Sequence, residues 1–188
     1  NRSQIEFTIE GNDEKNWAIR FGLTAIKNVG HAAIDTILAA RRSDGNFSSF
    51  RDFCNRVDLG KVNKKTLESL IKAGAMDVFG KRAALLTAIG KISDDAQRQK
   101  KQSSSGQVGL FDTGDTQQIA DDVLPDVAEL QKTELLRFEK ELLGFYLTEH
   151  PLTPQFSRIA NKVSHDIGDI TSADAGSIVI LGGIISSC

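Results

Sequence analysis

Apolar residues first alternate along the chain and then change to a helical spacing. In residues 1–22, Ile5, Phe7 and Ile9 take every second position, and Trp17, Ile19 and Phe21 do the same after a Gly-Asn-Asp sequence. A period of two on both sides of a turn predicts a β-hairpin. From residue 23 to 96 the spacing of three and four predicts four short helices. Their apolar stripes are Ala33, Ile34, Ile37 and Leu38, then Phe50, Phe53, Cys54 and Val57, then Leu67, Leu70 and Ile71, and finally Ala84, Leu85, Ala88, Ile89 and Ile92.

Capping residues support these helices. Ser48 or Ser49 is suited to cap the start of the second helix, and Asn63 the start of the third, because their short polar side chains accept the free backbone N–H groups of a first turn. Gly74 is suited to end the third helix. We therefore expect a compact helical unit over residues 23–96.

The composition changes after this unit. Residues 97–125 are rich in Gln, Ser, Lys, Asp and Gly without an apolar period, which predicts a flexible linker. In residues 126–169, a stripe of Leu135, Phe138, Leu142 and Phe145 predicts a long amphipathic helix that ends before Pro151. β-branched residues in 170–188 predict a strand that lacks its neighbours. Together with the missing initiator methionine, this indicates a piece of a longer polypeptide.

Composition excludes several classes of protein. The chain has 188 residues, of which 40% are hydrophobic and 26% charged. No run is apolar enough to cross a membrane or to act as a signal peptide, and Cys54 and Cys188 belong to no zinc or disulfide pattern, so we expect a cytoplasmic protein. His31, His150 and His165 are scattered, and no arrangement of catalytic or metal-binding residues is present.

The charge is unevenly distributed. Residues 15–101 hold 17 Lys and Arg against 8 Asp and Glu, whereas the whole chain has a net charge of -2. A basic first half beside an acidic second half favours a polyanionic partner such as nucleic acid, although a solvated basic surface would give the same count.

The sequence Lys27-Asn28-Val29-Gly30 leads directly into the first helix at His31. The first N–H groups of a helix have no partner inside the helix, and with the helix dipole they form an anion site. Asn28 tolerates positive φ, Gly30 allows close approach, and Lys27 adds a positive charge.

This turn resembles the helix-hairpin-helix motif, with Asn28 in place of the first glycine. A second, more degenerate copy follows at Lys72, Ala73, Gly74 and Ala75. Tandem hairpins of this kind imply contact with the backbone of duplex DNA through residues 27–31 and 72–75, without reading bases. The alternative is that both turns are only the ends of core helices.

One apolar pair lies inside the predicted linker. Gln107, Val108, Gly109, Leu110 and Phe111 resemble the short peptide by which bacterial proteins dock on the sliding clamp of replication. Leu and Phe would enter an apolar pocket, and the Gln amide would supply hydrogen bonds at its rim. The alternative is a pair that packs on a neighbouring helix.

Six ordered segments, including AIKNVG, LIKAGAMD, GQVGLF and EKELLGFYLTEHPL, resemble the C-terminal region of bacterial replicative DNA polymerase III alpha subunits. The resemblance implies a mainly α fold: a β-hairpin leading in from the fingers, a tandem helix-hairpin-helix domain, a linker with the clamp motif at 106–111, a long helix, and the truncated first strand of an OB-fold. It also implies duplex DNA, the sliding clamp (beta subunit) and other holoenzyme subunits as partners.

The same resemblance locates the polymerase chemistry, with its Mg²⁺ ions, elsewhere in the parent protein. We expect no catalytic residue and no cofactor in this region. Two other functions stay open: the helix-hairpin-helix region of a DNA repair nuclease or ligase, and a purely structural spacer.

Overall fold

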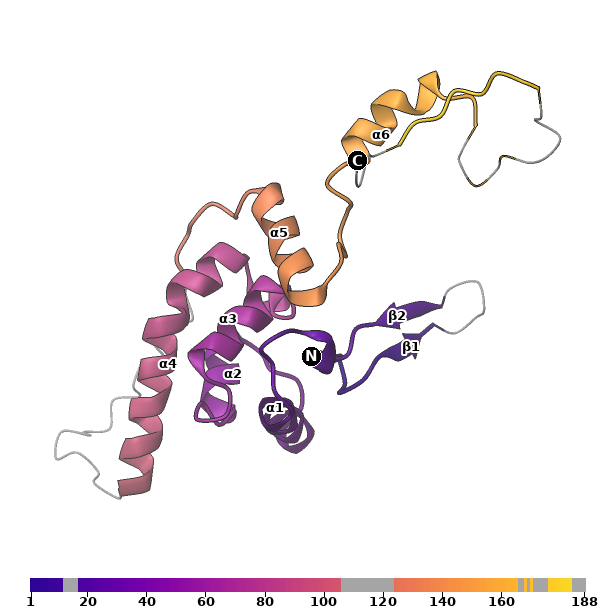
Figure 1. Ribbon diagram of the computed structural model, residues 1–188. Coiled ribbons are helices and arrows are strands. Elements are labelled where there is room, and N and C mark those ends of the chain that lie inside the picture. Colours follow the sequence, from indigo (N-terminus) through magenta and orange to yellow (C-terminus); the bar gives the residue numbers. More distant parts are fainter. Residues whose placement is uncertain (12–16, 106–123, 166–167, 169, 171–175, 184–188) are drawn as a thin grey trace. The chain divides into compact units, whose positions relative to one another are not determined.

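The computed structural model describes residues 1–11, 17–105, 124–165, 168, 170 and 176–183 (Figure 1). Contacts between residues divide the chain into two units, Asn1–Phe145 and Tyr146–Cys188, which are treated separately below. In the ranges that the structure describes, no helix is both long and apolar enough to cross a membrane.

The predicted hairpin is confirmed. Strands β1 (Thr8–Glu10) and β2 (Ala18–Arg20) pair antiparallel, with Ile9 opposite Ile19. On one side of the pair, Arg20 and Glu10 form two hydrogen bonds, one of them 2.6 Å long between Nη2 and Oε2. The alternating pattern of the sequence therefore separates an apolar side of the hairpin from a polar one.

Four helices follow in the first unit, as predicted: α1 (His31–Asp44), α2 (Phe50–Arg56), α3 (Lys64–Lys72) and α4 (Arg82–Ser105). Two short 3-10 helices, η2 (Leu23–Ala25) and η3 (Asp77–Phe79), precede α1 and α4. Ser49 caps α2 by accepting the N–H of Asp52, and Asn63 caps α3 by accepting the N–H of Thr66. Of the two serines considered for the α2 cap, the structure selects Ser49.

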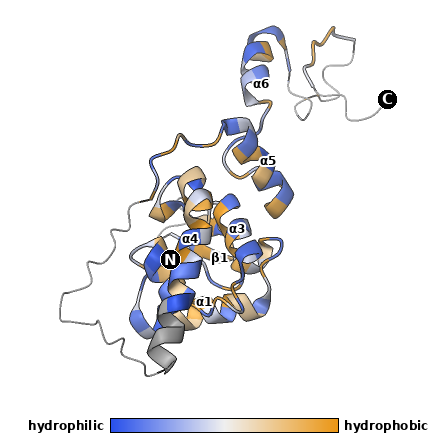
Figure 2. Cartoon of the chain, turned by 90° about the vertical axis from the view of Figure 1, so that its left-hand side faces the viewer, coloured by the Kyte–Doolittle hydropathy of each residue, from blue (hydrophilic) through white to orange (hydrophobic). Residues whose placement is uncertain are grey.

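The core lies between these helices and contains the predicted stripes. Hydrophobic and hydrophilic residues alternate along the helices in Figure 2, as expected for amphipathic segments packed around a shared interior. The large apolar side chains with the least exposed surface are Ile34, Leu38, Phe50, Cys54, Val57, Val62, Leu67, Leu70, Ile71 and Leu85, and the Glu139 side chain of the later helix α5 is equally buried. Residues from η2, from the α1–α4 helices and from the later helix α5 belong to this one cluster.

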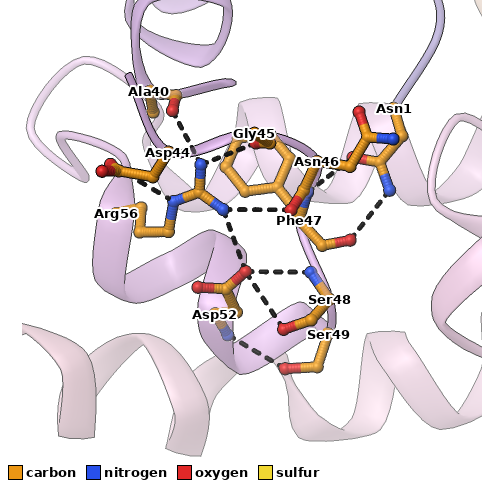
Figure 3. Close-up of polar contacts among 10 residues, drawn as sticks. All are labelled: Asn1, Ala40, Asp44, Gly45, Asn46, Phe47, Ser48, Ser49, Asp52 and Arg56. Carbon is orange, nitrogen blue, oxygen red and sulfur yellow. Dashed lines mark hydrogen bonds and ion pairs between the residues drawn. The ribbon is translucent and has the colours of Figure 1, made fainter. Parts of the chain in front are cut away.

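Arg56 fastens the connection between α1 and α2 (Figure 3). Its guanidinium lies 4.5 Å from the ring centroid of Phe47 and donates to the carbonyl oxygens of Ala40 at 2.7 Å and Gly45 at 2.8 Å. It also pairs with the Asp52 carboxylate at 3.1 Å. One arginine thus binds carbonyl oxygens of the last turn of α1 and of the residue that follows it.

Two helix boundaries differ from the predicted ones. Helix α4 continues to Ser105, beyond the predicted domain end at residue 96, because Gln, Arg and Lys favour helix and no Gly or Pro interrupts them. Helix α5 covers only Lys132–Leu143, because residues 124–131 are not helical and contact the start of α4 instead. Gly144, with φ of 87°, ends α5, so Phe145 lies beyond the helix.

The second unit contains α6 (Thr153–Ile159), which begins with Pro154 in its first turn, and the 3-10 helix η4 (Ala160–Lys162). The N–H of Ser164, just after η4, donates to the carbonyl of Ile180 at 2.9 Å. In the described part of residues 170–188 no strand is assigned, so the start of an OB-fold stays a prediction.

Candidate nucleic-acid interface

The turn between η2 and α1, residues 26–32, is called the Asn28 turn below. Ile26 and Val29 are 6% and 8% exposed and anchor the turn in the core, whereas Lys27, Gly30 and His31 are exposed. The apolar residues thus hold the turn at the surface and leave its polar residues facing solvent.

Asn28 has a left-handed conformation, with φ of 67°. Among non-glycine residues Asn adopts this region most readily, which explains how it replaces the first glycine of the motif. Helix α3 holds it in place: the hydroxyl of Thr66 donates to the carbonyl of Asn28 at 3.3 Å, and the Asn28 amide donates to the hydroxyl of Ser69 at 3.4 Å.

The start of α1 presents free donors. The N–H groups of Ala33 and Ile34 both donate to the carbonyl of Gly30, at 3.0 and 3.1 Å. Within the part of the chain that the structure describes, the N–H groups of Gly30, His31 and Ala32 have no acceptor. A Cβ added at Gly30 would meet nothing within 4 Å, so the space beside this residue is open. With the positive end of the helix dipole, they can bind an anionic oxygen.

Positive charge lies close to these donors. The N–H of Lys27 donates to the carbonyl of Leu142 at the end of α5, at 2.9 Å, which fixes the backbone while the side chain stays exposed. On α3, Lys65 and Lys72 share a side with Ser69, which contacts Asn28, because residues three and four apart are neighbours on a helix. Lys27 thus belongs to the Asn28 turn, and Lys65 and Lys72 lie on the side of α3 that contacts it.

The second predicted turn is built differently. The N–H groups of Ala73, Gly74 and Ala75 donate to the carbonyls of Ser69, Ile71 and Leu70, at 2.9, 2.9 and 3.0 Å. With Gly74 at φ of 80°, the last two bonds form a Schellman motif, which ends a helix. This turn has no free N–H at residues 73–75, so only Lys72 offers it a group for a phosphate.

Lys72 and Gly74 are also engaged by neighbouring helices. The Lys72 ammonium lies 5.1 Å from the ring centroid of Phe138 on α5. The Arg82 guanidinium lies against Gly74, donates to the carbonyl of Lys72 at 3.1 Å, and forms two bonds of 2.9 and 2.8 Å with the Asp77 carboxylate. Hydrogen bonding to Asp77 outweighs the effect of burial and raises the pKa of Arg82.

The start of α4 already binds a carboxylate of the same chain. Glu129 accepts the N–H groups of Arg82 and Ala83 at 2.9 and 3.0 Å. Burial opposes its ionisation, but the backbone N–H groups that it accepts outweigh this effect and lower the pKa of Glu129. Nearby, the Lys81 ammonium contacts Asp126 at 3.4 Å. Of the two helix starts that follow the predicted turns, only α1 is open.

Sequence reasoning missed the role of Glu129, and it placed Leu142 in the apolar stripe without its carbonyl contact to Lys27. Glu129 is 47 residues from Arg82. No local sequence pattern at Glu129 or Leu142 indicates a hydrogen bond to a backbone N–H so far away in the chain. The predicted clamp residues, Gln107, Val108, Gly109, Leu110 and Phe111, lie outside the described residues. Elsewhere, His150 accepts the N–H of Leu152 at 3.3 Å, and among the described side chains no cluster of three His, Cys, Asp or Glu is arranged for a metal ion.

Comparison with known proteins agrees with this geometry. The helix-hairpin-helix motif family matches residues 1–85, which contain the hairpin, the Asn28 turn and the turn at Gly74. This match and the Asn28 turn mark the first part of the chain as a helix-hairpin-helix region.

The relatives are more specific. The chain is 36% identical over 188 residues to the DNA polymerase III subunit alpha of Thermus aquaticus, covering 98% of the chain and 15% of the relative. It is 38% identical over 165 residues to that of Chlamydia pneumoniae, covering 86% and 13%. For Borreliella burgdorferi the identity is 36% over 190 residues, covering 100% and 16%. The chain belongs to the DNA polymerase III alpha subunit family, and it spans about 15% of the length of these relatives.

Proposed function

We propose that this chain is the part of a DNA-directed DNA polymerase, a replicative polymerase III alpha subunit, that holds duplex DNA and docks on the sliding clamp. The observation that carries the DNA proposal is the Asn28 turn, where three N–H groups without an acceptor in the described chain lie beside Lys27. The relatives, all named as polymerase III alpha subunits, favour this function over a repair nuclease, a ligase or a spacer.

The DNA contact is made to the backbone. A phosphate oxygen accepts hydrogen bonds from the N–H groups of Gly30, His31 and Ala32, and Lys27 contributes a charge that displaces a counterion. Such contacts fix the position of the duplex and read no bases. At the second turn, the N–H groups of residues 73–75 are engaged within the chain. These residues therefore contact the DNA backbone by van der Waals packing, and Lys72 supplies the positive charge.

The clamp contact is made by Gln107 to Phe111. Its support is the order of residues, with a polar amide three residues before a Leu-Phe pair. Joining two modest contacts in one chain raises the effective concentration of each, so the avidity exceeds either affinity by a factor of about 10² to 10⁴. A polymerase held in this way stays on its template.

The remaining functions belong to the parent protein. Nucleotide transfer, with two Mg²⁺ ions, takes place in another region of the subunit, and this region contributes no catalytic residue. We place the parent protein in the cytoplasm, in a holoenzyme with further subunits.

The DNA proposal is tested with Gly30→Leu. Gly30 has φ of -80° and open space around it, so a side chain fits the fold but crowds an approaching phosphate. We expect the affinity for a duplex, measured by fluorescence anisotropy, to fall about tenfold regardless of sequence. Ala39→Leu, at an exposed position of the same helix, is the matched control and should bind normally.

Charge reversal gives a second measurement of the same contact. Lys27→Glu should lower the slope of log affinity against log salt concentration by about one, since one phosphate contact is lost. Equal binding by Gly30→Leu and Ala39→Leu, or a loss that depends on the base sequence, would contradict backbone contact at this turn.

The clamp proposal has its own test. Replacing Gln107, Leu110 and Phe111 by alanine should abolish binding to purified clamp on a sensor surface and leave duplex binding unchanged. Replacing Gln117, Gln118 and Ile119 by alanine is the control, with three substitutions outside the motif. Retained clamp binding by the triple variant would refute this site.

A further inference from the structure

One face of the hairpin is apolar and open to solvent. It consists of Phe7, Ile9, Trp17, Ile19 and Phe21, and is called the hairpin apolar face below. Phe7, Ile9, Trp17 and Ile19 are 50%, 71%, 61% and 70% exposed. Cross-strand pairing makes the face continuous, because Ile9 lies opposite Ile19 and the rings of Phe7 and Phe21 are 4.8 Å apart.

The opposite face of the same hairpin is polar. It carries Thr8, Glu10 and Arg20, and the Glu10–Arg20 ion pair spans the two strands. An antiparallel sheet with one polar and one apolar face normally packs the apolar face against a core. A lone two-stranded hairpin is at best marginally stable in water, so this one needs a covering surface.

The apolar face continues toward the helical body at one end only. The ring of Phe21 lies 4.9 Å from that of Phe145, which is itself 37% exposed. The rest of the face has no neighbour in the described residues that would bury it. A contiguous apolar patch of this kind marks an interaction site.

Charge distinguishes between possible occupants. No Lys or Arg belongs to the hairpin apolar face. The guanidinium of nearby Arg20 pairs with the Glu10 carboxylate on the polar face. Nucleic acid is therefore a poor match, because its binding depends on cationic side chains. An aliphatic or aromatic protein surface is a good match, with Trp17 and Phe7 as the large anchoring side chains.

We propose that the hairpin apolar face packs against another region of the same polymerase polypeptide. The relatives are several times longer than this chain, which covers 13% to 16% of them, so most of the polypeptide lies outside the structure. The segment that covers the face is apolar and contacts Ile9, Trp17 and Ile19. This inference rests on membership of the family and is independent of the DNA and clamp contacts.

The test uses the full-length alpha subunit that contains this sequence. Oxidation of the Trp17 side chain by hydroxyl radicals is followed by mass spectrometry in the native protein and in urea. We expect it to be about tenfold slower in the native protein, because a covered side chain is protected. A rate within about twofold of the unfolded one, as 61% exposure implies, would overturn the proposal.

A pair of variants identifies the face. Ile19→Lys puts a charge into the hairpin apolar face and should restore fast oxidation of Trp17. Ala18→Lys adds the same charge at the neighbouring exposed position on the opposite face and should leave the protection intact. Equal effects of the two variants would overturn the assignment of this face.

Two further outcomes name other occupants. Protection that disappears on dilution would show that a second copy covers the face. Protection that appears only after duplex DNA is added would show that nucleic acid covers it. Either result would overturn the proposal while leaving the Gly30→Leu test of the Asn28 turn unaffected.

Discussion

The backbone N–H of Lys27 donates to the carbonyl of Leu142 across 2.9 Å, so the proposed DNA-contact turn is tied to the end of α5. Leu142 itself is 5% exposed and belongs to the core cluster. Helix α5 therefore does more than connect two parts of the chain, because it fixes the backbone of the residue that carries the positive charge.

Shortening Leu142 should loosen this link. Leu142→Ala removes a buried side chain and should lower the free energy of unfolding by about 2–5 kcal/mol, measured in urea. Hydrogen exchange of the Lys27 amide should become faster. Thr133→Ala, at an exposed position of α5, should change stability by less than about 0.5 kcal/mol. Unchanged exchange at Lys27 in Leu142→Ala would show that the two sites are independent.

Removing the guanidinium of Arg56 should destabilise the α1–α2 connection. Arg56→Met leaves the carbonyls of Ala40 and Gly45 without their donor and should cost about 2–4 kcal/mol. Arg42→Met, which removes an exposed charge from α1, should cost less than about 1 kcal/mol. Equal losses, measured by chemical denaturation, would mean that the carbonyl contacts of Arg56 contribute little.

The left-handed conformation of Asn28 predicts how substitutions there behave. Asn28→Val should lower stability by about 1–2 kcal/mol, because a β-branched side chain is strained at positive φ. Asn28→Gly should stay within about 1 kcal/mol of the original protein and keep its affinity for duplex DNA. Ser69→Ala removes only the hydrogen bond between the Asn28 amide and the Ser69 hydroxyl, so it measures that bond separately from the backbone strain. A stable Asn28→Val variant would argue against this backbone geometry.

The attachment of Glu129 to α4 should depend on pH. Its pKa is lowered in the folded state, so its contribution to stability is present above the unfolded pKa and is lost as the pH falls through the folded value, below about 4.5. The amide signals of Arg82 and Ala83 should shift with this titration in NMR spectra. In Glu129→Gln the titration should vanish, whereas in Glu134→Gln, on α5, it should persist.

Local patterns were enough to predict much of the fold. The hairpin, the buried stripes of α1 to α3 and the caps at Ser49 and Asn63 depend on neighbours within a few residues, which periodicity and capping preferences capture. The start of α1 directly after Gly30 could be predicted for the same reason.

Contacts between distant segments could not be predicted. The N–H groups at the start of α4 bind Glu129 from beyond the predicted linker, and those of residues 73–75 are engaged by a helix cap. A sequence pattern shows that a turn exists but not whether another segment occupies its donors. For that reason two turns of similar sequence differ in what they offer a ligand.

The bond between Glu129 and the start of α4 also closes a loop. Helix α4 ends just before residues 106–123, and Glu129, which follows them, contacts the start of the same helix, so the described residues on both sides of this stretch are attached to α4. A sliding clamp bound to residues 107–111 would therefore be connected to the first unit on both sides of its binding peptide. Cleavage of the backbone on one side of the bound peptide would then leave the connection on the other side intact.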